Sequence, residues 1–157
     1  MRILTKSLLL FATLILATSC GCKQDEKCDQ KTSTQTVKDQ KMNSKELEGI
    51  RKALDLYAEA AVKGDSKIAK PVFAETATMT YNENGKLVSV PIQVLFDYYD
   101  KDCPQQASYE ISDYSIADDA AIVRIESKFG DAEFSDMFTM VKDGDDWKIA
   151  SKIYHLK

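Results

Sequence analysis

The order of sequence patterns predicts an α+β domain in which three helices pack on one face of an antiparallel sheet. Between residues 43 and 103, apolar residues recur mainly at intervals of three and four, the period of a helix. From residue 106 onward the period becomes two, as in a strand with one buried face. Helices that precede strands, rather than alternate with them, are typical of α+β domains.

Three helices are predicted in the first half of this domain. The first begins at Asn43 with a capping-box-like pattern and ends at Gly64. Asp65 caps a second helix, which Pro71 should shorten or kink because proline removes a hydrogen bond. Pro91 suits the first turn of the third helix.

Six strands are predicted around these helices. Short strands at residues 77–81 and 87–90 flank Asn84-Gly85, a pair that favours a tight hairpin turn. Four longer strands follow the third helix. They are separated by turns rich in Asp and Gly at residues 118–119, 130–131 and 142–146.

The last hairpin places a carboxylate on an apolar sheet face. In its first strand, strict alternation puts four residues on one face: Phe134, Asp136, Phe138 and Met140. In its second strand, five residues share a face: Trp147, Ile149, Ser151, Ile153 and His155. Lys152 has the opposite parity and is therefore expected outside any pocket. An inward carboxylate is costly unless it is hydrogen bonded or neutral, so Asp136 has either a structural or a functional role.

Residues 1–19 have the pattern of a secretory signal. A basic start precedes an apolar run at residues 8–17, which is too short to span a bilayer as a permanent helix. Two small residues precede Cys20, and this segment resembles the lipobox of bacterial lipoproteins. The resemblance implies that Cys20 is lipidated, with Cys22 as the fallback site. A plain secretory signal is the alternative.

Residues 20–42 are predicted to form a disordered tether, because polar and charged residues dominate and offer almost nothing to bury. The folded domain is then residues 43–157. The resemblance implies an exported chain that its lipid holds in a Gram-negative envelope, facing the periplasm or the cell surface. Loss of residues 1–19 lowers the formal charge from −4 to −6, since only Arg2 and Lys6 leave. Neither a nucleic-acid surface nor a polybasic membrane patch is expected.

The cysteines predict neither a disulfide framework nor a metal site. After lipidation of Cys20 an odd number remains: Cys22, Cys28 and Cys103. A loop closed by Cys22 and Cys28 stays open as an alternative. The chain has no Cys-x-x-Cys pair and a single histidine, His155, so no metal is expected. It also has no phosphate-binding glycine loop, and no cofactor is predicted.

Several motifs, taken in order, resemble the nuclear transport factor two-like (SnoaL-like) superfamily of cystatin-like α+β cones. The motifs are Tyr57 followed by Gly64-Asp65, residues 73–77, Asp136-Met137-Phe138, Trp147-Lys148-Ile149, Lys152 and Tyr154-His155. They span residues 44–156, and the group that they resemble most is labelled putative lumazine-binding. The resemblance implies a curved sheet and helices that form a cone with a pocket at its open end. Members include isomerases, dehydratases and polyketide cyclases.

The resemblance also supplies a catalytic alternative. Steroid isomerases of this fold pair a tyrosine on the first helix with a protonated aspartic acid on a late strand, and a separate aspartate moves the proton. Tyr57 and Asp136 fall at the first two positions and are the candidate catalytic pair. The third position falls on Tyr81, a phenol with a pKa of about 10 that is a poor general base at neutral pH. Catalysis would require a raised pKa of Asp136 and another base near Tyr81.

The sequence therefore predicts a lipid-anchored envelope protein whose pocket binds a small apolar or aromatic ligand without catalysis. The expected ligand-binding residues are Tyr57, Tyr81, Tyr99, Asp136, Phe138 and Trp147. One alternative is an isomerase or dehydratase that uses Tyr57 and Asp136. Another is an interaction module that dimerises through the outer sheet face. That face is expected to present Met137, Thr139, Val141, Ala150 and Tyr154.

Overall fold

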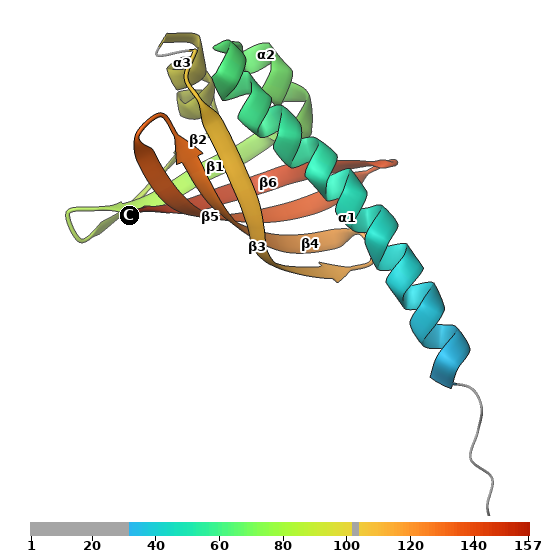
Figure 1. The fold of residues 1–157 in the computed structure, drawn as a ribbon. Coiled ribbons are helices and arrows are strands. Elements are labelled where there is room, and N and C mark those ends of the chain that lie inside the picture. Colours follow the sequence, from blue (N-terminus) through green and yellow to red (C-terminus); the bar gives the residue numbers. More distant parts are fainter. Residues whose placement is uncertain (1–31, 102–103) are drawn as a thin grey trace, which may run out of the picture.

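Six strands form one curved sheet, and the helices lie against one of its faces (Figure 1). The computed structural model describes residues 32–101 and 104–157, with side chains from residue 44. The chain order is α1 (Thr32–Lys63), α2 (Ser66–Ala69), the 3₁₀ turn η1 (Lys70–Val72), β1 (Phe73–Glu83), β2 (Lys86–Pro91), α3 (Gln93–Lys101), β3 (Ala107–Ala117), β4 (Ala120–Phe129), β5 (Ala132–Asp143) and β6 (Asp146–Leu156). This order confirms the predicted α+β class.

The sheet is mixed, whereas the sequence analysis predicts an antiparallel one. Its strand order is β2-β1-β6-β5-β4-β3, and all neighbours are antiparallel except β1 and β6. The chain leaves the β1–β2 hairpin through α3 and the meander of β3 to β5 before β6 inserts beside β1. A connection of that length places no restriction on strand direction, unlike a two-residue hairpin turn. The parallel pairing therefore has no local sequence signal.

Helix α1 begins earlier than predicted. It starts at Thr32 rather than Asn43, and its N-terminal end reaches past the sheet (Figure 1). The backbone of residues 32–42 is therefore helical, whereas the sequence analysis predicts a disordered tether there. Residues 1–31, with the predicted signal and Cys20, lie outside the described residues, as does Cys103. In the part of the chain that is described, no helix is long and apolar enough to cross a membrane.

The predicted caps and turns agree with the structure in most places. Asp65 accepts a hydrogen bond from the backbone N–H of Lys67 at 3.0 Å and so caps α2. Helix α2 lasts one turn before Pro71 enters η1, as the missing proline N–H predicts. Asn84 and Gly85 both have positive φ, 52° and 79°, which the predicted tight turn requires. Pro91 differs from the prediction, because it ends β2 and α3 begins two residues later.

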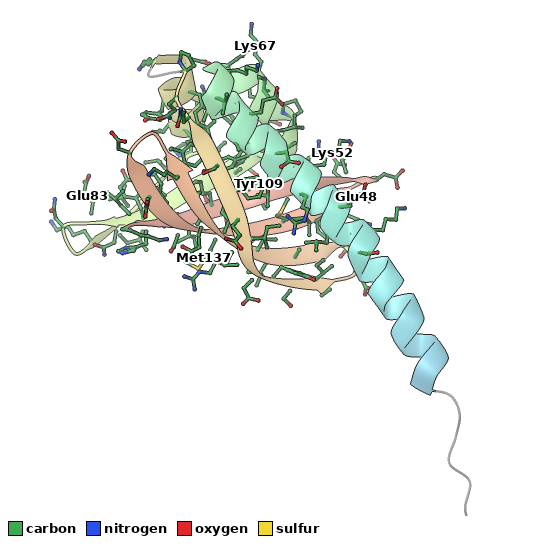
Figure 2. All side chains as sticks on the ribbon, viewed as in Figure 1. Glu48, Lys52, Lys67, Glu83, Tyr109 and Met137 are labelled. Carbon is green, nitrogen blue, oxygen red and sulfur yellow. The ribbon has the colours of Figure 1, made fainter. Side chains whose placement is uncertain are left out.

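The core lies between α1 and the inner face of the sheet. Its fully buried side chains include Ile50, Leu54 and Tyr57 from α1 and Val123, Ile125, Phe138 and Met140 from β4 and β5. Two polar links also hold α1 on the sheet. Tyr109 of β3 points towards α1 and donates a hydrogen bond to Asp55 (Figure 2). Near the middle of α1, Glu46 accepts hydrogen bonds from the Trp147 indole at 3.1 Å and from Lys142 at 2.6 Å.

Candidate functional site

A β-bulge in β6 decides which side chains face the interior. Two consecutive residues of β5, Thr139 and Met140, pair with Ser151 and Ile149, so Ala150 is an extra residue in β6. A bulge of this kind interrupts strict alternation, because two residues of one strand oppose one residue of its neighbour. The strand therefore changes parity at Ala150.

The bulge corrects the predicted faces of the last strand. Lys152 points inward and is 4% exposed, whereas Ile153 is 43% exposed and His155 is also exposed. Tyr154, expected on the outer face, is half-buried on the inner one. The predictions for these four residues are wrong because they extend the alternation of Trp147 and Ile149 across the bulge. No residue of the pattern, such as a glycine or proline, marks its position.

Asp136, Lys152 and Ser127 form a buried polar cluster on the inner sheet face. Asp136 is fully buried, and its two oxygens have separate partners. The Ser127 hydroxyl donates to one oxygen, and the Lys152 ammonium donates to the other and forms an ion pair with it. The three residues lie on β4, β5 and β6, at diagonal positions that side chains can bridge. The expected cost of burying the Asp136 carboxylate is therefore offset by partners on both sides.

Burial sets the protonation behaviour around this cluster. It lowers the pKa of Lys152, an effect that the neighbouring Asp136 carboxylate opposes. Burial also raises the pKa of Tyr57 well above its ordinary value, and the charge of Asp136 raises it further. The pKa of Tyr154 is raised by burial and by its neighbour Tyr81. Tyr57 and Tyr154 therefore remain neutral hydrogen-bond donors at physiological pH.

An apolar cavity of about 340 Å³ lies beside the cluster, between α1, α3 and the inner face of the sheet. Its size is within the range of small-molecule pockets, about 300 to 1,000 Å³. The lining residues are Tyr57, Met79, Tyr81, Val94, Leu95, Tyr98, Tyr99, Phe129, Ala132, Phe134, Lys152 and Tyr154. Among the residues that the structure describes, Lys152 is the single charged one in this lining.

Aromatic rings surround the Lys152 ammonium at the cavity wall. Tyr81 and Tyr154 stack with ring centroids 5.0 Å apart and an interplanar angle of 27°. Phe134 meets Tyr154 edge to face at 5.7 Å. The Nζ atom of Lys152 lies 4.2 Å from the centroid of the Tyr154 ring and 6.0 Å from that of Phe134. These distances allow cation–π attraction, which partly replaces the water that the ammonium loses.

The structure brings three of the predicted ligand-binding residues together at the cavity: Tyr57, Tyr81 and Tyr99. Two others lie behind its wall. Asp136 does not line the cavity and reaches it only through Lys152, and Phe138 is fully buried against Tyr57 with ring centroids 5.4 Å apart. Trp147 is predicted in the pocket, but it lies at the other end of the sheet against α1. Alternation predicts its inward face and does not show at which end of the sheet the cavity lies.

Sequence reasoning missed two central lining residues, Lys152 and Tyr154, because both lie beyond the bulge. Phe134 shares the predicted inner face with Asp136 but is not among the predicted ligand-binding residues. Among the described residues, Asp136 is occupied by Ser127 and Lys152 and no carboxylate lines the cavity. Of the two candidate catalytic residues, Tyr57 lines the cavity and Asp136 lies behind its wall. Nor do the described residues hold a group of His, Cys, Asp or Glu suited to a metal.

A curved sheet that encloses an aromatic cavity under its helices defines a cone-shaped protein of the nuclear transport factor 2-like class. The chain belongs to the family described as "Putative lumazine-binding", whose model matches residues 45–155. The search among curated proteins returned no match.

Solved structures show the same fold. An NTF2-like protein of unknown function from Shewanella baltica OS155 is 33% identical, with a TM-score of 0.64, over 71% of this chain and 94% of that one. An NTF-2 like protein of unknown function from Silicibacter pomeroyi DSS-3 is 20% identical, with a TM-score of 0.67, over 73% and 98%. A ketosteroid isomerase-like protein from Erwinia carotovora atroseptica SCRI1043 is 17% identical, with a TM-score of 0.55, over 71% and 95%. The last two similarities concern the fold alone.

Proposed function

We propose that this protein binds a small, largely apolar or aromatic molecule in the cavity and catalyses no reaction on it. The observation that carries the proposal is the cavity of about 340 Å³, walled by aromatic rings and containing one buried ammonium, that of Lys152. Apolar walls with a few fixed polar groups are the usual composition of a small-molecule site. The absence of a carboxylate from the described lining supports binding over proton transfer.

The family description names lumazine, a flat bicyclic heteroaromatic compound with carbonyl groups. A flat ring of this kind suits the cavity because the rings of Tyr81, Phe134 and Tyr154 offer faces and edges for stacking. We therefore take lumazine as the first probe of the site.

Calorimetric titration of the intact chain with lumazine tests the proposal, together with native mass spectrometry of the chain purified from its host. Ala132→Phe fills part of the cavity and is expected to weaken binding at least about tenfold, since overlap with a ligand costs more than 1 kcal/mol. Ala120→Phe is the matched control, because Ala120 is exposed and lies outside the cavity. Absence of a host-derived ligand, together with no binding of lumazine, would contradict the proposal.

We also propose that the chain is exported and held in the cell envelope by a lipid on Cys20. The support is the lipobox-like segment that ends at Cys20. Metabolic labelling with an alkyne fatty acid should mark the wild-type chain and the Cys22→Ser variant, and Cys20→Ser should lose both the label and the membrane fraction. If only Cys22→Ser lost the label, Cys22 would be the lipidated residue. If the wild-type chain were not labelled, the proposed lipid anchor would be wrong.

A further inference from the structure

We infer that the cavity selects an uncharged ligand with a carbonyl-type acceptor for Lys152 and discriminates against a carboxylate. This inference rests on the proposed function and specifies its ligand class. A buried lysine in a binding site would ordinarily indicate an anionic ligand. Here we infer a neutral one.

The charge of Lys152 is already balanced inside the protein. Asp136 is fully buried behind the cavity wall and forms an ion pair with Lys152. The other oxygen of Asp136 accepts from Ser127, which fixes the carboxylate in place. Whether the proton of the pair resides on nitrogen or on oxygen, the pair has no net charge. A ligand anion therefore meets a neutral pair and not a free cation.

The rest of the cavity adds no charge. Lys152 is the single charged residue in the described lining, and the remaining positions are aromatic, aliphatic or phenolic. Because burial raises the pKa of Tyr57, its phenol is neutral and adds no negative charge either. A carboxylate that enters this space loses its hydration without gaining a net counter-charge, which is unfavourable.

A neutral carbonyl avoids that cost and still finds a donor. A lysine ammonium has three N–H donors, and Asp136 is the acceptor that the described residues provide for it. The Nζ atom also lies over the Tyr154 ring, at 4.2 Å from its centroid, which places it at the aromatic wall that a flat ligand would contact. An acceptor at the edge of such a ligand can therefore take a charge-assisted hydrogen bond from Lys152 without altering the charge of the site.

Three probes with the same ring system test this inference on the intact wild-type chain: naphthalene, 2-naphthamide and 2-naphthoate. We expect calorimetry to show that 2-naphthamide binds about tenfold or more tightly than 2-naphthoate, and more tightly than naphthalene, because it alone gains the hydrogen bond without the cost of a buried charge. Binding of 2-naphthoate as tight as that of 2-naphthamide would overturn the inference. Binding of naphthalene as tight as that of 2-naphthamide would also overturn it and would leave the proposed function intact. If none of the three binds, the inference fails, and the lumazine titration and native mass spectrometry decide the proposed function.

Two variants separate charge balance from a general preference for neutral probes. Asp136→Asn leaves the Lys152 charge unbalanced, so the affinity for 2-naphthoate should rise about tenfold at mildly acidic pH while that for naphthalene stays unchanged. Asp136→Asn combined with Lys152→Met removes the charge and should abolish this gain. An unchanged affinity of Asp136→Asn for 2-naphthoate would overturn the inference. If the variants do not fold, as judged by circular dichroism, the wild-type ranking decides.

Discussion

At the residue scale, Asp136 and Lys152 stabilise the fold only as a pair. Both are almost fully buried, so removal of one partner leaves an uncompensated charge or forces the other to become neutral. Such a loss typically costs about 3 to 5 kcal/mol, whereas replacement of the whole pair by apolar side chains is often neutral.

We therefore predict that Lys152→Met lowers the free energy of unfolding by about 3 to 5 kcal/mol, because it leaves the Asp136 carboxylate buried with Ser127 alone. Lys152→Met combined with Asp136→Leu should recover most of that loss, since no charge remains. Urea unfolding of both variants gives the comparison. Equal destabilisation in the single and double variants would show that the two side chains are not coupled.

Tyr57 makes the fold sensitive to alkaline pH. Its pKa in the folded chain is raised by burial and by Asp136, so the unfolded chain releases the phenolic proton first as pH rises. The stability that depends on this group is therefore complete below the unfolded pKa of about 10 and decreases above it, by up to about 1.4 kcal/mol per pH unit.

Tyr57→Phe should reduce this alkaline loss. The ring contacts with Phe129 at 5.5 Å and Phe138 at 5.4 Å remain, so the cost at neutral pH should be only that of a hydroxyl, about 1 kcal/mol. Urea midpoints measured from neutral to strongly alkaline pH should fall less steeply than in the wild type. Tyr114→Phe is the control because Tyr114 is 43% exposed. If the urea midpoint of Tyr57→Phe fell with pH as steeply as that of the wild type, the alkaline loss of stability would not be due to Tyr57.

At the element scale, the bulge in β6 shows where prediction from the sequence stopped. The alternation of β5 correctly predicts the inner face of Phe134, Asp136, Phe138 and Met140, because that strand is regular along these residues. The same rule fails in β6 after Ala150, where nothing in the residue types marks an extra residue. The Asp136 side of the buried pair was therefore predictable, and the Lys152 side was not.

Deletion of Ala150 tests this account of the strand. Without Ala150, Ile149 and Ser151 become neighbours and pair with Met140 and Thr139 in regular register, so Lys152 still faces inward. We expect a folded variant that loses about 1 to 3 kcal/mol, as for an ordinary single change. Deletion of Thr139 is the control, because it reverses the faces of one half of β5 and should unfold the domain. Thermal unfolding compares the two deletion variants. An equal loss of stability in both would argue against a bulge at Ala150.

The backbone of helix α1 lies close to the last hairpin at Gly49. A Cβ atom added there would lie 2.8 Å from Cδ1 of the Trp147 ring. Gly49→Ala should therefore destabilise the domain by about 1 to 3 kcal/mol, although alanine in a helix interior normally adds about 1 kcal/mol of stability. In a Trp147→Leu background the same substitution should be much less harmful. Urea unfolding of the wild type, the two single variants and the double variant completes this double-mutant cycle. Additive effects on the free energy of unfolding would exclude a contact between residue 49 and Trp147.

At the scale of the whole molecule, the order of helices and strands was predictable from the sequence, and the parallel pairing of β1 with β6 was not. Caps, turns and periodicity are local, which is why Asp65, Gly85 and the four late strands appear where the sequence predicts them. The parallel contact of β1 with β6 joins residues far apart in the chain and leaves no local pattern. The cavity depends on that contact, because Tyr81 and Tyr154 meet across it.

The outer face of the sheet carries an apolar patch. Four exposed side chains form it: Ile122 (60%), Met137 (41%), Val141 (46%) and Ile153 (43%). Met137 pairs with Ile153 across β5 and β6, and it lies on the face of the sheet opposite α1 (Figure 2). Ile153 replaces the predicted Tyr154 in this patch because of the bulge. Contiguous exposed apolar residues on a sheet are typical of an interaction surface.

We predict that a second copy of the chain covers this patch. A twofold contact buries the same residues on both partners, so one substitution changes the interface twice. Ile122→Lys should therefore shift the chain from dimer to monomer, because two added charges would lose their hydration at the contact. Light scattering over a range of concentrations measures the shift, and Leu87→Lys is the control because Leu87 is 76% exposed and lies outside the patch. A wild-type chain that stays monomeric at the highest concentration would rule out this contact.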